Sequence, residues 1–227
     1  MLPKVIVYSC VTAGYDDITQ TLLSSAPTPE ENVTFVLFTD NPPVGDTGVW
    51  GLRPLTWNHA ICPRRSARYH KCMTHKVLPE HDYSVWVDGS QIFKGIKVWE
   101  DLLRPQVDAK CDLATFKHPL RQCVYQEEKA CERHRKDNVV VMRDQMLRYK
   151  AAGYPVYHGM VETACVIRAN TSAIHAFNSA WWSEISSDSF RDQLSFNYTC
   201  WTLQQEYGQI PGHREKSPFF NFVSHKR

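Results

Sequence analysis

The candidate site of this chain is centred on one ten-residue stretch, Tyr83-Ser84-Val85-Trp86-Val87-Asp88-Gly89-Ser90-Gln91-Ile92. A short apolar run leads into a carboxylate and then a glycine, which predicts a buried strand that ends in a tight turn. In open α/β sheets, ligands bind at the carboxyl ends of strands. A carboxylate there can hold a divalent cation, and the cation can hold a diphosphate. Taken alone, however, an Asp-Gly pair is more often only a turn.

The bulk composition is that of an ordinary globular protein. The chain has 227 residues, of which 43% are hydrophobic and 22% charged, which suits one large domain. The formal net charge of +2 provides no strong field for attracting nucleic acid or an anionic membrane. We therefore expect no nucleic-acid partner, and any bound anion must be held by a local cluster of cations.

The chain ends and the cysteines indicate where such a protein would reside. No signal peptide precedes the first apolar run, and no run of 18 apolar residues is present. The eight cysteines include no CxxC pair, which argues against a structural zinc site and favours free thiols. These features predict a soluble cytoplasmic protein without a transmembrane segment, unless the sequence is an excised domain.

Apolar strand patterns alternate with helical patterns along the whole chain. We expect strands at 4–9, 33–39, 50–53, 83–87 and 113–116, and a last apolar strand that ends at Arg168. Helices are expected at about 15–24, from 63, at 99–103 with Pro105 closing it, as a solvated pair over 120–149, from 172 and from 190. The alternation predicts a single α/β domain whose central sheet is mostly parallel and flanked by helices.

Small polar residues follow the first two predicted strands. Thr12, Gly14 and Tyr15 come after the first strand, and Asp40 comes after the second. In a parallel sheet these strand ends lie side by side and could form a nucleoside pocket. Gly14 would permit a close backbone approach, and Tyr15 offers a flat face to a base. Two ordinary turns between strand and helix would explain the same residues.

A basic stripe, which is a row of cationic side chains without intervening acids, precedes the stretch at 83–92. Pro63 begins a helix, as proline does at a first helical position. The cations share one face of that helix, at Arg64, Arg68, Lys71 and His75. No acid lies between Pro63 and Glu80, whereas a solvated face usually alternates its signs. The stripe suits phosphate binding, although a merely exposed basic helix remains the alternative.

Two later carboxylates and the tail complete the candidate site. Glu162 lies in an otherwise apolar strand, where a carboxylate is costly unless it is paired or functional. Asp192 opens a helix, where the helix dipole alone would favour it. A tail with three phenylalanines should pack onto the body and bring His225 and Lys226 to a definite place.

The motifs together resemble a known family over essentially the full chain. The matching pieces are Val-Tyr-x-x-x-Thr-x-Gly-Tyr-Asp at 7–16, Phe-Thr-Asp-Asn at 38–41, Pro-Arg-Arg-x-x-Arg at 63–68 with Lys71, Trp-Val-Asp-Gly-Ser at 86–90, Lys-His-Pro-Leu-Arg at 117–121, Glu-Thr at 162–163 and Arg-Asp-Gln-Leu-Ser at 191–195. They resemble the glycosyltransferase-like domains of plant mucilage- and turgor-related proteins and of small bacterial and viral transferases. That family is similar to GT-A transferases, which implies one domain over 1–227, with a nucleotide-binding half at about 1–93 and an acceptor half at about 94–227.

The resemblance implies transfer of a sugar from a nucleotide-diphosphate donor to a glycan, lipid or small-molecule acceptor. It assigns donor binding to Thr12, Gly14, Tyr15, Asp40, Arg64, Arg68, Lys71, Ser90 and Lys226. It assigns a Mn²⁺ or Mg²⁺ ion to Asp88 and His225, with His213 as the competing histidine. Glu162 and Asp192 become the catalytic candidates that orient the acceptor hydroxyl or remove its proton. The metal motif of such enzymes is usually Asp-x-Asp, whereas Ser90 stands at its third position here.

Two other functions stay open at this point. A plant relative has been associated with ceramide cleavage, so a hydrolase such as a ceramidase is the first alternative. The sequence offers neither a Gly-x-Ser-x-Gly elbow nor an HExxH zinc helix for hydrolysis. The incomplete Asp-x-Asp motif suggests the second alternative, a non-catalytic module that binds a nucleotide or a sugar.

Overall fold

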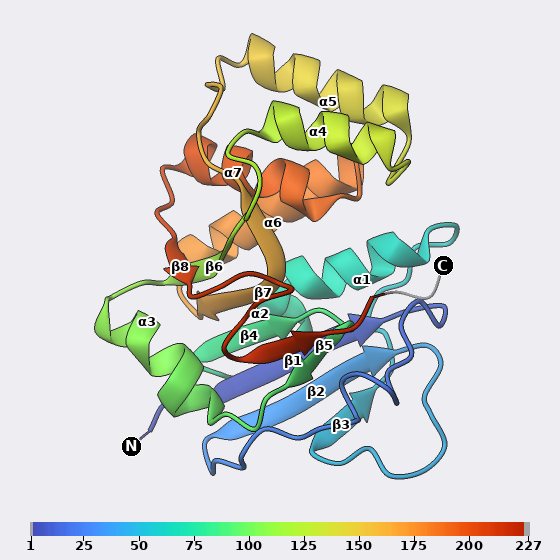
Figure 1. Ribbon diagram of the computed structural model, residues 1–227, viewed down its shortest axis with the longest axis vertical. Coiled ribbons are helices and arrows are strands. Elements are labelled where there is room, and N and C mark those ends of the chain that lie inside the picture. The colour runs from blue at the N-terminus through green and yellow to red at the C-terminus, as the bar shows by residue number, and fades with distance from the viewer. Residues whose placement is uncertain (1, 225–227) are drawn as a thin grey trace.

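A seven-stranded sheet forms the centre of the protein (Figure 1), in a computed structural model that describes residues 2–224. Its strand order is β3-β2-β1-β4-β7-β6-β8. The strands are β1 (Val5–Val11), β2 (Val33–Thr39), β3 (Trp50–Arg53), β4 (Tyr83–Val87), β6 (Leu113–Lys117), β7 (Val161–Ala169) and β8 (Gly208–Ile210). The first four are parallel to one another, β7 is antiparallel to β4 and β6, and β8 is parallel to β6. The predicted α/β class and the mostly parallel sheet are confirmed.

Apolar side chains cover the sheet on both faces. Every residue of β1 and of β7 is buried, as expected of strands rich in β-branched residues in the middle of a sheet. One face packs against α1 (Pro63–Cys72), α2 (Thr74–Val77), α6 (Ser172–Ser187) and α7 (Asp192–Leu203). The other face packs against a π-helix (Val98–Leu103), α3 (Arg104–Asp108) and a two-stranded sheet of β5 (Gln91–Phe93) and β9 (Phe220–Phe222).

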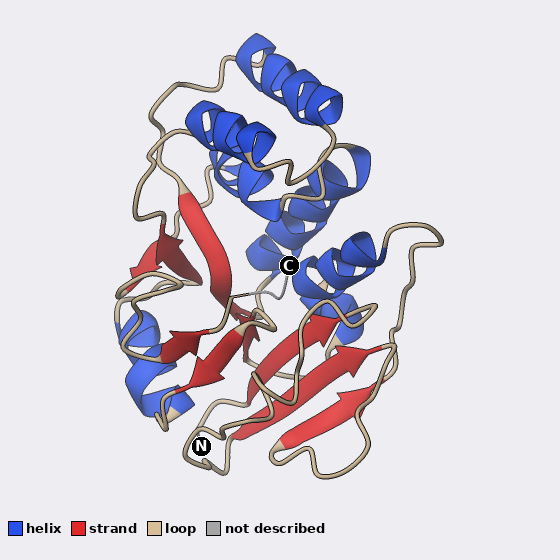
Figure 2. Cartoon of the chain, turned by 45° about the vertical axis from the view of Figure 1, so that its right-hand side comes forward, coloured by secondary structure: helices blue, strands red, loops and turns tan. Residues whose placement is uncertain are grey.

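A helical hairpin lies beyond the first helical layer. It consists of α4 (Val124–Arg133) and α5 (Val139–Ala151), and both Figure 1 and Figure 2 show it farthest from the parallel strands. Asn138 caps α5 by accepting hydrogen bonds from the backbone of Val140 and Val141. Tyr149 of α5 stacks on Tyr198 of α7, with 3.7 Å between the ring centroids. In the turn between α4 and α5, Asp137 accepts the Ser189 hydroxyl at 2.6 Å and the Phe190 N–H at 3.0 Å, which ties the turn to the segment before α7.

The tail packs onto the body, as the sequence predicted. Strand β9 pairs with β5, and Phe220 is completely buried beside Phe93. His225 and Lys226, which the same prediction concerned, lie outside the described residues. All eight cysteines are free thiols, in agreement with the expectation. Within residues 2–224, every helix is too short or too polar to span a lipid bilayer.

Three local predictions were wrong. Residues 15–24 form successive turns instead of a helix, because Thr19 and Thr21 bond to Asp17 and compete with helical hydrogen bonding. Helix α1 ends at Cys72, so His75 belongs to α2 and is not part of the basic stripe. Pro105 does not close a helix but stands in the first turn of α3, where its missing N–H is tolerated.

Candidate functional site

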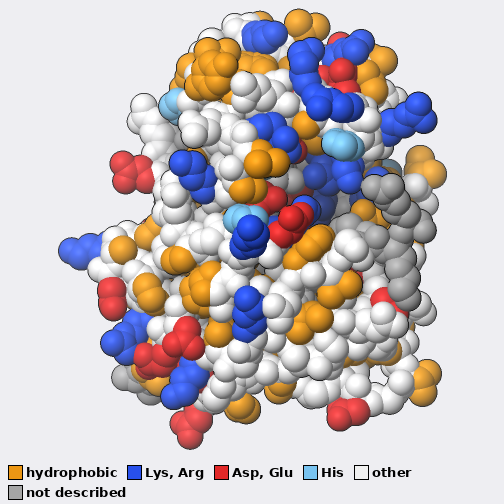
Figure 3. All heavy atoms as spheres, in the orientation of Figure 1, with side chains coloured by type: hydrophobic (Ala, Val, Ile, Leu, Met, Phe, Trp, Pro, Cys, Tyr) orange, Lys and Arg blue, Asp and Glu red, His pale blue; other side chains and the backbone are white. Residues whose placement is uncertain are grey.

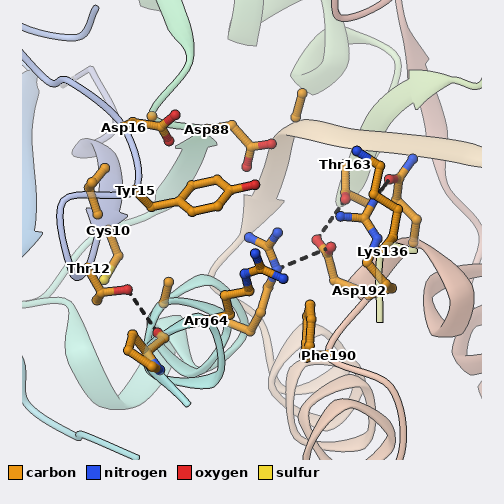
Figure 4. A pocket seen from close by; sticks show the side chains of 18 of the residues that line it. Cys10, Thr12, Tyr15, Asp16, Arg64, Asp88, Lys136, Thr163, Phe190 and Asp192 are labelled. Carbon is orange, nitrogen blue, oxygen red and sulfur yellow. Dashed lines mark hydrogen bonds and ion pairs between the residues drawn. The ribbon is translucent and has the colours of Figure 1, made fainter. Parts of the chain in front are cut away.

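A cavity of about 410 Å³ opens where β1 and β4 end, beneath the α4–α5 turn (Figure 4). Its lining comes from six further places: the start of α1, the α4–α5 turn, the start of β7, the residues before α7, the start of α7 and the segment between β8 and β9. Seven predicted site residues line it, namely Thr12, Tyr15, Arg64, Arg68, Asp88, Glu162 and Asp192. The fold thus brings segments from both halves of the chain to one cavity.

The other predicted residues lie elsewhere. Gly14 lines a neighbouring depression, and Asp40 holds the loop by accepting the Ala13 N–H at 2.9 Å. Lys71 and Ser90 are buried behind the cavity wall. His213 is not among the lining residues and pairs with Lys216 in a bridge. The predicted ligands His225 and Lys226 are outside residues 2–224.

Asp192 is the most strongly paired carboxylate of the cavity. Its Oδ2 lies 2.6 Å from Lys71 Nζ and accepts the Thr163 hydroxyl at 2.7 Å, and its Oδ1 lies 3.2 Å from Arg68 Nε. Burial alone would raise the pKa of Asp192, but the attraction of Arg68, Lys71 and Arg191 outweighs burial and holds the pKa well below its usual range. A carboxylate in this state is a weak base and a good counter-ion.

Lys71 connects Asp192 to Asp88. Its ammonium group also donates to the Thr163 carbonyl at 2.6 Å and lies 3.4 Å from Asp88 Oδ1. The backbone carbonyl of Lys71 accepts from Tyr8 and from Arg168, both at 2.7 Å. Because Lys71, Tyr8, Thr163 and Arg168 are buried, the end of α1 is held rigidly against β4 and β7. Lys71 therefore acts on the cavity through the carboxylates that it holds.

Asp88 ends β4 as the sequence predicted, with about a quarter of its side chain exposed to the cavity. The Trp86 indole donates to its Oδ1 at 2.7 Å. Asp16, a second carboxylate, lies beside it and lines the same cavity (Figure 4). A Cβ at Gly89 would stand only 2.6 Å from Asp16 Oδ2, so the absent side chain of Gly89 leaves room for Asp16. Asp16 belongs to the motif at 7–16, but no role was predicted for it.

Glu162 has a different environment from Asp192. It is 8% exposed, and its Oε2 accepts the backbone N–H of Arg214 at 3.1 Å. Burial raises the pKa of the Glu162 carboxyl, and the hydrogen bond and charge of Arg214 counteract this only in part. Of the two predicted catalytic carboxylates, Glu162 is therefore the one with a basicity suited to accepting a proton.

Arg64 crosses the cavity between two aromatic rings. Its guanidinium carbon lies 5.3 Å from the centre of the Tyr15 ring and 5.1 Å from that of Phe190. Tyr15 is half exposed, so its ring can also be presented to a ligand. The contact joins the loop after β1 to the segment before α7, which places an aromatic surface and a cation together at the mouth of the cavity.

Sequence reasoning missed one part of the cavity entirely. His134, Arg135 and Lys136 line it from the α4–α5 turn, although the pattern indicated a solvated helical pair there. Arg191 and Arg214 are two further lining cations that were not predicted as site residues. The available signal was the uninterrupted cationic run at 133–136, at the point where the helical pattern breaks. Only the packing of the hairpin on α7 shows that this run faces the sheet.

Comparison with known proteins identifies the family of the chain. The TOD1/MUCI70 glycosyltransferase-like domain matches residues 2–217. The chain belongs to this family. Among its relatives, "Probable hexosyltransferase MUCI70" of Arabidopsis thaliana is 24% identical over 218 residues, covering 85% of this chain and 36% of the relative. "Alkaline ceramidase TOD1" of Arabidopsis thaliana is 25% identical over 177 residues, covering 72% of this chain and 37% of the relative. The chain thus spans little more than a third of each of these two proteins.

Membership of the TOD1/MUCI70 family confirms the predicted resemblance, and the mixed sheet flanked by helices is consistent with a GT-A-like domain. The division into a nucleotide half and an acceptor half stays a prediction. The roles of the individual site residues likewise stay predictions.

Proposed function

We propose that this TOD1/MUCI70 domain transfers a sugar from a nucleotide-diphosphate donor to a hydroxyl group of an acceptor. The observation that carries the proposal is the meeting, in one cavity, of a strand-end carboxylate, a set of cations and a buried glutamate. Family membership and the relative named as a hexosyltransferase support the same reaction class. The whole-protein activities of those longer relatives are not needed for this argument.

The donor would lie along the ends of β1 and β4. Tyr15 offers its ring to the base, while the loop of Thr12 and Gly14 is held by Asp40 and by the Pro63 carbonyl, which accepts the Thr12 hydroxyl at 2.9 Å. Arg64 and Arg68 of α1 lie on the cavity wall and would neutralise phosphate charge. Stabilisation of the leaving diphosphate in this way is mainly electrostatic catalysis.

A divalent cation, Mn²⁺ or Mg²⁺, would be held by Asp88 with Asp16 beside it. Among residues 2–224, no three His, Cys, Asp or Glu side chains are grouped so that they could hold a metal ion. Two carboxylates nevertheless suit a hard cation that also binds phosphate oxygens and water. When bound, the ion would neutralise charge on the diphosphate. Asp16 then takes the place that Ser90 leaves without a carboxylate, and His225 stays a predicted additional ligand.

Glu162 is the better candidate for the base that accepts the proton of the acceptor hydroxyl. Its raised pKa and its place on the cavity wall support this role. Asp192 would serve as the counter-ion that positions Arg68 and Lys71. In this arrangement Glu162 exchanges a proton with the acceptor, and Asp192 holds the cations in place.

The test is a screen of common sugar nucleotides for release of the nucleoside diphosphate, with and without Mn²⁺. We expect turnover with at least one donor and its loss in Glu162→Gln. Ceramide release is assayed in parallel, because one relative is named as a ceramidase. Nucleotide binding without turnover would favour the non-catalytic module, ceramide release without sugar transfer would favour the hydrolase, and absence of all nucleotide binding would overturn the donor site.

A further inference from the structure

The cavity lining carries more cations than carboxylates. Six of its described lining residues are Lys or Arg: Arg64, Arg68, Arg135, Lys136, Arg191 and Arg214. Four are acidic: Asp16, Asp88, Glu162 and Asp192. Asp192 is already paired with Arg68 and Lys71, and Glu162 is paired with Arg214. Much of the remaining positive charge lies at the α4–α5 turn and just before α7.

Three of these cations form what we call the cationic wall, defined as Arg135, Lys136 and Arg191. None of the three has a carboxylate of the described residues within ion-pair distance. Arg135 and Lys136 are exposed, and the Nε of Arg191 is buried without a hydrogen-bond partner in residues 2–224. Figure 3 shows Lys and Arg side chains gathered at the centre of this face, beneath α4 and α5. Arg135 and Lys136 therefore present positive charge to whatever occupies the cavity, and Arg191, which also attracts Asp192 and donates to Gln193, adds to it.

The position of the wall separates it from the proposed donor site. In Figure 4, Lys136 lies with Thr163 and Asp192 on one side of the cavity, and Tyr15 and Asp16 lie on the other. Arg64 stands between the two sides, against both Tyr15 and Phe190. A diphosphate at the ends of β1 and β4 would meet Arg64 and Arg68 first. The cationic wall faces the place that remains for the second substrate.

We propose that the acceptor is anionic, carrying a carboxylate or phosphate group that Arg135, Lys136 and Arg191 bind. The inference rests on the proposed function, since it assigns a substrate class to the same cavity. Arginine binds both kinds of anion through paired hydrogen bonds, and lysine adds a point charge. Because Arg135 and Lys136 are exposed, their electrostatic contribution to acceptor affinity should fall as the salt concentration increases. The contribution of contacts with neutral sugar groups should not depend on salt in this way.

Calorimetric titration of the full chain, with UDP and Mn²⁺ present, tests the inference. The probes are a glucuronic acid-terminated disaccharide against its glucose-terminated counterpart, and glucose 6-phosphate against glucose. We expect at least one acidic probe to bind about tenfold more tightly than its neutral counterpart, a difference of about 1.4 kcal/mol, and to weaken at high salt. The probe that binds more tightly identifies the acid as carboxylate or phosphate. Equal affinity within both pairs, or no binding of any probe, would overturn the proposal.

Variants locate the effect on the wall. Arg135→Gln/Lys136→Gln and Arg191→Gln should each remove most of the preference for the acidic probe and leave UDP affinity unchanged. Lys129→Gln is the matched control, because Lys129 is exposed on α4 but does not line the cavity. If the double variant instead weakens UDP and leaves the acidic probe unaffected, the wall serves the donor and the inference is wrong. Separate UDP titrations without the probes show whether the donor site itself has failed.

Discussion

The ammonium group of Lys71 lies 2.6 Å from Asp192 Oδ2, and both side chains are buried. This contact ties the end of α1 to the start of α7 directly behind the cavity wall. It also places the Lys71 ammonium 3.4 Å from Asp88 Oδ1, so one buried cation is shared by two carboxylates of the candidate site. The stability of the domain and the shape of its site thus depend on the same ion pair.

Replacement of Asp192 should destabilise the protein strongly. Asp192→Asn leaves Lys71 and Arg68 without their counter-charge, and breaking a buried pair costs about 3–5 kcal/mol. Denaturant unfolding at neutral pH measures the change in the free energy of unfolding. Asp108→Asn is the control, because its pair with Arg104 is exposed and should contribute about 1 kcal/mol or less. Similar losses in the two variants would contradict the view of Asp192 as the central counter-ion.

The same pair predicts how stability depends on pH. The pKa of Asp192 is held below its usual range, so the folded protein binds this proton more weakly than the unfolded chain does. Its stabilising contribution is therefore complete above about pH 4 and is lost as pH falls through the folded-state pKa. Unfolding of the wild type and Asp192→Asn is compared at pH 7 and pH 3. The difference in the free energy of unfolding between the two proteins should be smaller at pH 3 than at pH 7. An equal difference at the two pH values would refute this explanation.

Loss of the Glu162 carboxylate should abolish most of the transferase activity. Glu162→Gln removes the proposed proton acceptor, which typically costs about 10²- to 10⁴-fold in rate. Burial raises the pKa of Glu162, so the wild-type rate should rise with pH through a pKa above that of an ordinary glutamate. The rate constant with saturating donor is measured across pH. Glu80→Gln, which alters an exposed carboxylate that does not line the cavity, should retain both the rate and the profile.

Asp16 should matter for the cation even though it lies outside the Asp-Gly-Ser stretch. Asp16→Asn is expected to weaken Mn²⁺ binding about tenfold or more when UDP is present, because one of two carboxylates is lost. Electron paramagnetic resonance of free Mn²⁺ measures the affinity directly. Asp46→Asn, in an exposed loop away from the cavity, is the control. Unchanged Mn²⁺ affinity in Asp16→Asn would leave Asp88 as the only carboxylate of the site.

A methyl group at position 89 should disturb the same site through packing. In Gly89→Ala the new Cβ would stand 2.6 Å from Asp16 Oδ2 and 2.7 Å from Val11 Cγ2, so both must shift. We expect a loss of about 1–3 kcal/mol in stability together with weaker Mn²⁺ binding. Gly51→Ala on β3 is the comparison, since its Cβ would meet only the Phe35 carbonyl at 3.4 Å. If Gly89→Ala binds Mn²⁺ normally, the close approach of Asp16 is not needed for the cation.

Local sequence patterns were sufficient to predict six of the seven strands of the central sheet, its mostly parallel arrangement and the position of Asp88 at the end of β4, whereas β8 was not predicted. These follow from short-range patterns, since runs of β-branched residues that end in small polar residues favour buried strands whatever lies around them. The basic face of α1 was also predictable, because helical spacing alone aligns Arg64 and Arg68. Where side-chain hydrogen bonds override the pattern, as around Asp17, the prediction of a helix was wrong.

Only the tertiary structure decided which groups share the cavity. Strand β7 is inserted antiparallel between β4 and β6, which brings Glu162 and Thr163 toward Asp88. Packing of the hairpin on α7 turns Lys136 toward the sheet. Contacts of this kind join residues that are far apart in the chain, and no local periodicity of the sequence predicts them. The buried pair of Lys71 and Asp192 is the clearest case, because its strength comes from a low-dielectric interior that exists only after folding.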